Sequence, residues 1–213
     1  MTSTISINKE HFRIIDEAKR EISYGCNQVW YHGYWQCRAG CGPTTATNLY
    51  IYLSQKSPEF LSTRNSMRSK ADSLALMEEI WHYVKPSFRG VNTLRMFYEP
   101  FARYLKKKGL AASYQYFEVK PDYKSSEILA GMLLFIKEAL EQDVPLAFLN
   151  LCNGEEQNLD RWHWVTIIGL EFSEDNDQVF VTFLDEGVTK TINLALWYHT
   201  TSLGGGLVCF RNL

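Results

Sequence analysis

The chain has 213 residues, of which 46% are hydrophobic and 22% are charged, and its formal net charge is −2. This composition allows a full hydrophobic core and excludes a disordered or fibrous protein. The small net charge gives no electrostatic reason to expect a nucleic-acid partner.

The N-terminal segment, residues 1–8, has neither the basic nor the apolar stretch of a signal peptide, so we expect none. Residues 9–23 place apolar residues such as Phe12 and Ile15 at helical spacing, which predicts a helix. A loop rich in Gly, Cys, Tyr and Trp is expected over residues 24–40. We interpret its aromatic side chains as core packing rather than as the wall of a substrate groove, because large aromatic rings bury well.

A cysteine lies at the start of the next predicted helix, in the motif Gly40-Cys41-Gly42-Pro43. We expect this helix to run from Cys41 to about Ser54. A thiol at a helix N-terminus lies among unpaired backbone N–H groups at the positive end of the helix dipole, and both favour the thiolate. Because the thiolate is the reactive form, Cys41 is our candidate nucleophile.

The middle of the chain is predicted to be mainly helical, because apolar residues recur at helical spacing between capping and breaking residues. Asn92 can cap one helix and Gly109 can end it. The predicted elements are helices over residues 72–83, 93–108 and 125–142, and a strand over residues 112–119.

The last third of the chain reads as strands separated by turn residues such as those at 174–177. Helices followed by antiparallel strands indicate an α+β fold, with the nucleophile's helix packed on the sheet. No linker or repeat interrupts the chain, so we expect a single domain over residues 1–213. No apolar run approaches the roughly 20 residues of a membrane span. The predicted strands cover residues 144–151, 162–172, 178–184, 188–194 and 206–211.

A histidine and an acid accompany the cysteine. His163 begins the strand Trp162-His163-Trp164-Val165, where an imidazole can reach a cleft while the strand fixes its position. Asp185 ends the following strand. If the two strands pair across the turn at residues 174–177, the two side chains lie at similar height. A carboxylate there could orient one imidazole nitrogen and leave the other for Cys41.

A glutamine is the fourth candidate. Gln36 lies five residues before Cys41. The tetrahedral intermediate of acyl transfer needs hydrogen-bond donors for its oxyanion, which a side-chain amide and the backbone N–H of the nucleophile can supply.

The order Gln36, Cys41-Gly42-Pro43, His163 and Asp185 resembles that of the papain-like cysteine peptidases. It is most similar to the bacteriocin-leader peptidase domains of ABC transporters and their stand-alone bacterial relatives. The resemblance implies a papain-like fold with a Cys-His-Asp triad and a glutamine oxyanion donor. It departs at Gln36, since the family's glutamine usually lies six residues before its cysteine.

Three functions follow from these residues. The main hypothesis is hydrolysis of a peptide or amide bond through a Cys41 thioester. A second is acyl transfer to an amine or thiol, because phytochelatin synthases share a similar Cys-Gly, His, Asp order. A third is a binding module without catalysis on the same fold.

The remaining cysteines indicate no metal site. Cys37 and Cys41 could be imagined as zinc ligands together with His32, but structural zinc takes paired ligands at both ends of a site, whereas Cys152 and Cys209 stand alone. Five cysteines at irregular spacing suit reduced thiols in the cytoplasm. We expect no metal, no cofactor and no membrane partner.

Overall fold

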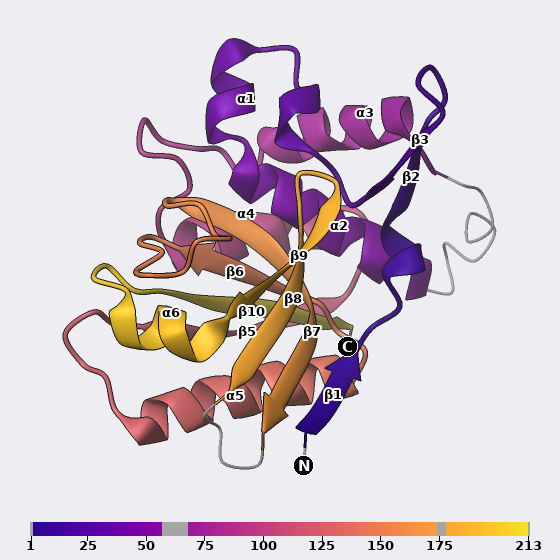
Figure 1. Ribbon diagram of the computed structural model, residues 1–213. Helices are drawn as coiled ribbons and strands as arrows, with labels where there is room; N and C mark the ends of the chain where they lie inside the picture. Colours follow the sequence, from indigo (N-terminus) through magenta and orange to yellow (C-terminus); the bar gives the residue numbers. More distant parts are fainter. Residues whose placement is uncertain (1, 57–67, 174–177, 213) are drawn as a thin grey trace.

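The computed structural model describes residues 2–56, 68–173 and 178–212 and has an α+β fold (Figure 1). Its main sheet has seven strands, in the order β5-β10-β6-β7-β8-β9, with β1 paired to the distal half of β7. Every strand pair of this sheet is antiparallel. The strands are β1 (Thr2–Ser6), β5 (Ala112–Val119), β6 (Leu146–Asn150), β7 (His163–Ser173), β8 (Val179–Asp185), β9 (Val188–Asn193) and β10 (Gly205–Asn212).

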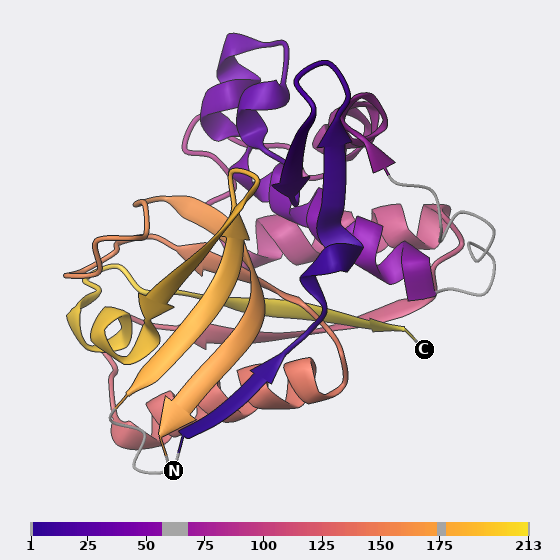
Figure 2. The same ribbon diagram turned by 45° about the vertical axis from the view of Figure 1, so that its right-hand side comes forward.

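Helices cover both faces of the main sheet (Figures 1 and 2). Leu146 and Phe148 of β6 pack in one hydrophobic cluster with helix α5 (Ser126–Glu141). Ala147 and Leu149 of the same strand pack in a second cluster with α2 (Cys41–Lys56) and α4 (Leu94–Lys107). Successive side chains of a strand point to opposite faces, so this alternation buries the sheet on both sides. The α2 helix is therefore held against the strands that follow it in sequence.

The remaining elements lie outside the main sheet. A three-stranded sheet has the order β3-β2-β4, in which β2 and β3 form an antiparallel pair. No described helix is both long and apolar enough to cross a membrane. These elements are β2 (Arg13–Asp16), β3 (Glu21–Tyr24), β4 (Arg68–Ser69), the 3-10 turns η1 (Lys9–Phe12) and η2 (Gln28–Trp30), and helices α1 (Tyr34–Ala39), α3 (Lys70–Trp81) and α6 (Leu194–Thr200).

Most of the predicted elements from Cys41 onward are confirmed, with ends set by capping residues. Ser125 caps α5 by accepting from the backbone N–H of Ile128. Thr93, and not the predicted Asn92, caps α4 in the same way. The short α6 follows β9 and was not predicted. The predicted turn at 174–177 lies outside the described residues.

The helix predicted over residues 9–23 is wrong. The segment forms the turn η1 and then the hairpin β2–β3, in which Ile15 pairs with Ile22. Phe12 and Ile14 are buried, and their two-residue separation is that of an extended strand, whereas Phe12 and Ile15 have helical spacing. Pairing with a neighbouring strand decided between the two patterns. The loop expected over residues 24–40 contains η2 and α1 instead. Its aromatic side chains are only partly core packing, because Tyr31 is buried whereas Tyr34 and Trp35 are exposed.

Candidate active site

Cys41 is the first residue of α2, as predicted, and its side chain is nearly buried. Close packing explains the glycines on either side. A Cβ atom on Gly40 would lie 2.4 Å from the carbonyl oxygen of Gln36, and one on Gly42 would lie 2.8 Å from Cγ2 of Val91. Larger residues at either position would displace the start of the helix and the thiol with it.

His163 and Asp185 form a buried hydrogen-bonded pair. Nε2 of His163 lies 2.6 Å from Oδ1 of Asp185. His163 is the first residue of β7 and Asp185 the last of β8, and these two strands are antiparallel neighbours. Because Nε2 is engaged by the acid, Nδ1 is the ring nitrogen that remains for another partner.

A tight hairpin turn places Asp185. The two residues between β8 and β9 are Glu186 and Gly187, with φ of 51° and 83°, as a type I′ turn requires. The segment before Cys41 is bonded to this turn. The N–H of Tyr24 donates to the carbonyl of Gly187 at 2.8 Å, and Nδ2 of Asn27 donates to the carbonyl of Glu186 at 2.8 Å. These bonds hold the acid's turn against the loop that leads to the nucleophile.

Asn48 joins α2 to the other parts of the site. Its Oδ1 accepts from the backbone N–H of Cys26 at 2.8 Å, and its Nδ2 donates to Oγ1 of Thr166 on β7 at 3.1 Å. This buried amide therefore connects the helix that begins at Cys41 with the strand that begins at His163.

The charges of the site favour a protonated imidazole. Burial lowers the pKa of His163, but its hydrogen bond to Asp185 and its interaction with Cys41 more than offset burial and raise the pKa to about 10. Burial raises the pKa of Asp185, but His163 and Lys190 more than offset this and hold the pKa below its ordinary value. An imidazolium held between a carboxylate and a thiol is the arrangement that stabilises a thiolate.

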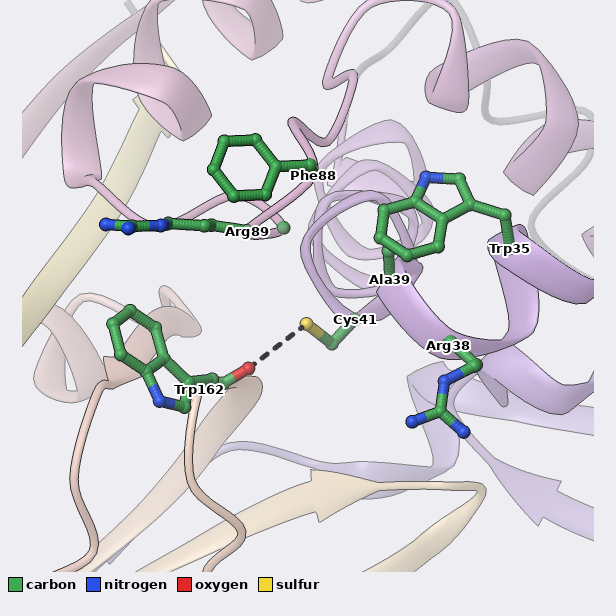
Figure 3. Close-up of a pocket in the computed structure, with 8 residues that line it drawn as sticks. Trp35, Arg38, Ala39, Cys41, Phe88, Arg89 and Trp162 are labelled. Carbon is green, nitrogen blue, oxygen red and sulfur yellow. Dashed lines mark hydrogen bonds between the residues drawn. The ribbon is translucent and has the colours of Figure 1, made fainter.

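Cys41 faces two spaces. On one side it lines a narrow cavity together with His163 and Asp185. On the other side it lines an open cleft of about 550 Å³. Figure 3 shows its sulfur pointing into this cleft, where it makes a weak 3.9 Å hydrogen bond to the carbonyl oxygen of Trp162. The thiol is therefore reachable from the cleft and backed by the buried pair.

Gln36 is directed away from this site. Its Nε2 donates to Oε2 of Glu78 at 2.6 Å, and its Oε1 accepts from the N–H of Gly33 at 3.1 Å at the start of α1. It lines neither the cleft nor the cavity. One end of its amide caps α1 and the other is bonded to Glu78 of α3, so the structure does not bring Gln36 into the cluster with Cys41.

A different glutamine lies in the cluster. Gln28 of η2 lines the narrow cavity with Cys41 and His163. Its Oε1 is buried and has no hydrogen-bond partner among the described residues. Sequence reasoning missed Gln28 because it lies 13 residues before Cys41, with α1 between them. The polar pair Asn27-Gln28 at the start of a turn was the one available signal.

A further acid, Asp160, lies near the pair. One ligand atom each of Asp160, His163 and Asp185 lie within 4.8 Å of one another. Nε2 of His163 and both oxygens of Asp185 are engaged, the latter by His163 and Lys190. The partners His163 and Lys190 account for the orientation of the Asp185 carboxylate without a metal.

No known protein family and no curated protein matches the sequence. Among solved structures, the chain is similar to one described as the crystal structure of UfSP from C. elegans, with 8% sequence identity and a TM-score of 0.49. The similarity covers 99% of this chain and 34% of that chain. This chain therefore spans about a third of the length of that protein.

Proposed function

We propose that this chain is a papain-like cysteine peptidase or amidase, in which Cys41, His163 and Asp185 form the catalytic triad. The observation that carries the proposal is the 2.6 Å bond between Nε2 of His163 and Asp185, beside a cysteine at a helix N-terminus. The acid orients the ring by one nitrogen, so the other nitrogen is available to the thiol.

The reaction follows from these positions. The Cys41 thiolate attacks the carbonyl carbon of the substrate, and His163 holds the thiol proton as imidazolium. When the tetrahedral intermediate collapses, the C–N bond breaks and His163 gives its proton to the leaving amine. Neutral His163 then takes a proton from water, which attacks the thioester and releases the acid and the thiol. Asp185 keeps the ring oriented throughout.

The oxyanion of the intermediate needs donors near the sulfur. The backbone N–H groups of Cys41 and Gly42, in the first turn of α2, can serve as donors, since Pro43 has no N–H and the N–H of Thr44 is bonded to Gly40. We propose that the side-chain amide of Gln28 supplies a further donor in place of Gln36. Its support is the position of Gln28 in the cavity beside Cys41 and His163, where its Nε2 would be the donor.

Selective labelling of the thiols tests the activated nucleophile. Cys37 is the matched control, because it is more exposed than Cys41 and has no described histidine partner. Iodoacetamide near neutral pH should label Cys41 faster than Cys37, which exposure alone would not produce. His163→Ala should slow the labelling of Cys41. Equal labelling of the two cysteines would remove the proposal.

Product analysis distinguishes hydrolysis from the alternatives. A peptide library incubated with the wild-type protein and with Cys41→Ala should show cleavage only by the wild type. Mass spectrometry of reactions with added amine or thiol would reveal an acyl transferase by a new conjugate. Selective labelling of Cys41 without turnover of any peptide or amide would favour the third hypothesis, a binding module without catalysis.

A further inference from the structure

The cleft beside Cys41 has a charge opposite to that of the whole chain. Arg38 and Arg89 line it, and none of its lining residues is acidic. The chain has a net charge of −2, so positive charge is not a general property of its surface. Within residues 2–56, 68–173 and 178–212, neither guanidinium forms an ion pair. Both arginines therefore have their bidentate donor groups available to a ligand.

Three large aromatic side chains of the cleft are exposed. The exposed fractions are 45% for Trp35, 81% for Phe88 and 47% for Trp162. Trp162 also has a φ of 56°, a left-handed conformation that bulky residues rarely adopt. Exposed aromatic surface gathered in one cleft is typical of a binding site, and backbone strain persists where function requires it.

The residues that line the cleft form two groups on either side of Cys41, called its two arms below, and both groups have the same chemical character. Figure 3 shows Trp35 and Arg38 on one side of the Cys41 sulfur, and Phe88, Arg89 and Trp162 on the other. Each side of the Cys41 sulfur therefore has one arginine and at least one aromatic ring. A substrate that passes over Cys41 meets both arms.

Backbone bonds fix the arm that carries Phe88 and Arg89. Ser87 and Gly90 exchange backbone hydrogen bonds of 3.1 and 2.9 Å across the turn. The next residue, Val91, accepts at 2.5 Å from Nε1 of Trp164, which follows His163 on β7. This arm is therefore positioned relative to the catalytic strand before a ligand binds, which lowers the entropic cost of binding.

We propose that the cleft binds an extended peptide with acidic side chains on both sides of the scissile bond, next to large apolar side chains. Carboxylates would pair with Arg38 and Arg89, and apolar side chains would cover the exposed rings. A cleft of about 550 Å³ suits a short extended segment. This inference rests on the proposed function, since the bound peptide is the molecule that Cys41 attacks.

Binding to the Cys41→Ala variant tests the cleft without turnover. Three fluorescein-labelled peptides are compared by anisotropy. The first has glutamates flanking a central Ala-Gly next to phenylalanines, and an amidated C-terminus. The second has glutamines in place of the glutamates. The third is the glutamine peptide with a free C-terminal carboxylate. We expect the acidic peptide to bind at least about tenfold more tightly than the other two, with a preference that weakens as salt is raised.

Substitution of the arginines tests the cause of the preference. Arg38→Gln/Arg89→Gln in the Cys41→Ala background should reduce it below about threefold, because the charge-assisted bonds to the carboxylates are lost. Arg103→Gln is the matched control, since Arg103 is an exposed arginine on α4 outside the cleft. Equal affinity for the acidic and glutamine peptides, or a preference that survives the double substitution, would overturn the inference. Tighter binding of the third peptide than of the acidic peptide would also overturn it, because the cleft would then recognise the C-terminal carboxylate and not acidic side chains.

Incubation of the wild-type protein with the same peptides separates this inference from the proposed function. Arginine-dependent binding without cleavage would contradict the proposed peptidase activity but would support the preference of the cleft for acidic peptides. Cleavage of all three peptides at equal kcat/KM would support the peptidase and contradict the preference.

Discussion

Lys190 holds the oxygen of Asp185 that His163 does not use. Nζ of Lys190 lies 2.7 Å from Oδ2, while Nε2 of His163 lies 2.6 Å from Oδ1. The two donors come from β9 and β7, the strands on either side of β8. Both donors stabilise the ionised carboxylate and contribute to the lowered pKa of Asp185. Lys190 is therefore a positioning residue for the proposed triad.

Removing the Lys190 cation should shift the pH dependence of the reaction. In Lys190→Met the pKa of Asp185 rises, so its ionised form is lost at a higher pH than in the wild type. The acidic limb of kcat/KM should move to higher pH, with a loss of roughly tenfold on that limb, equivalent to about 1.4 kcal/mol. Lys190→Arg keeps the charge and should restore the wild-type profile. A pH–rate profile of Lys190→Met that overlays the wild type would argue against this role.

The two glutamines offer a matched pair of substitutions. Gln28→Ala should lower kcat by roughly 10²–10³ with KM little changed, because an oxyanion donor acts mainly in the transition state. Gln36→Ala should change kcat less than about threefold, since the amide of Gln36 is bonded to Glu78. Steady-state kinetics on one cleaved peptide measure both. The reverse order of effects would return the oxyanion role to Gln36.

The raised pKa of His163 links stability to pH. Folding raises this pKa from 6.5 to about 10, so the folded protein holds a proton that the unfolded chain releases above pH 6.5. The stability that His163 contributes is complete below about pH 6.5 and is lost as the pH rises towards about 10. The difference in free energy of unfolding between wild type and His163→Gln, measured by urea denaturation, should therefore shrink between pH 6 and 10. A difference that stays constant between pH 6 and 10 would contradict this linkage.

Gly42 tests the packing at the nucleophile. Gly42→Ala places a methyl group against Val91 and should destabilise the protein by about 1–3 kcal/mol, with lower activity as Cys41 shifts. Val91→Ala in the same chain makes room and should recover part of both losses.

Gly131 in α5 provides the control for Gly42. Its added Cβ would lie 3.4 Å from the Phe117 ring, an ordinary contact. Gly131→Ala should therefore be neutral or stabilising, since alanine favours a helix over glycine. The midpoint of urea denaturation measures the stability of each of these variants. Equal midpoints for Gly42→Ala and Gly131→Ala would contradict the packing explanation.

The sequence predicted an element correctly where its capping residues, apolar spacing and composition all indicated the same structure. The α5 helix has both a serine cap and a continuous apolar face, and residues 112–119 of β5 show strand composition from end to end. The prediction for residues 9–23 failed because the segment contains both spacings, helical between Phe12 and Ile15 and strand-like between Phe12 and Ile14, and strand pairing decided between them.

The triad candidates were visible in the sequence because each lies at an element boundary. Cys41 begins a helix, His163 begins a strand and Asp185 ends one. Gln28 was not visible, because a buried oxygen without a partner exists only in three dimensions. Lys190 could have been found, since a two-residue turn after Asp185 places it diagonally across the hairpin.

The hydrogen bonds from Tyr24 and Asn27 to the turn at residues 186–187 span most of the chain. The ribosome makes residues 24 and 27 well before their partners at 186 and 187. A nascent chain therefore carries Cys41 for a time without the acid and the cation of the proposed triad. The proposed triad is complete only when the hairpin β8–β9 has been made and has docked.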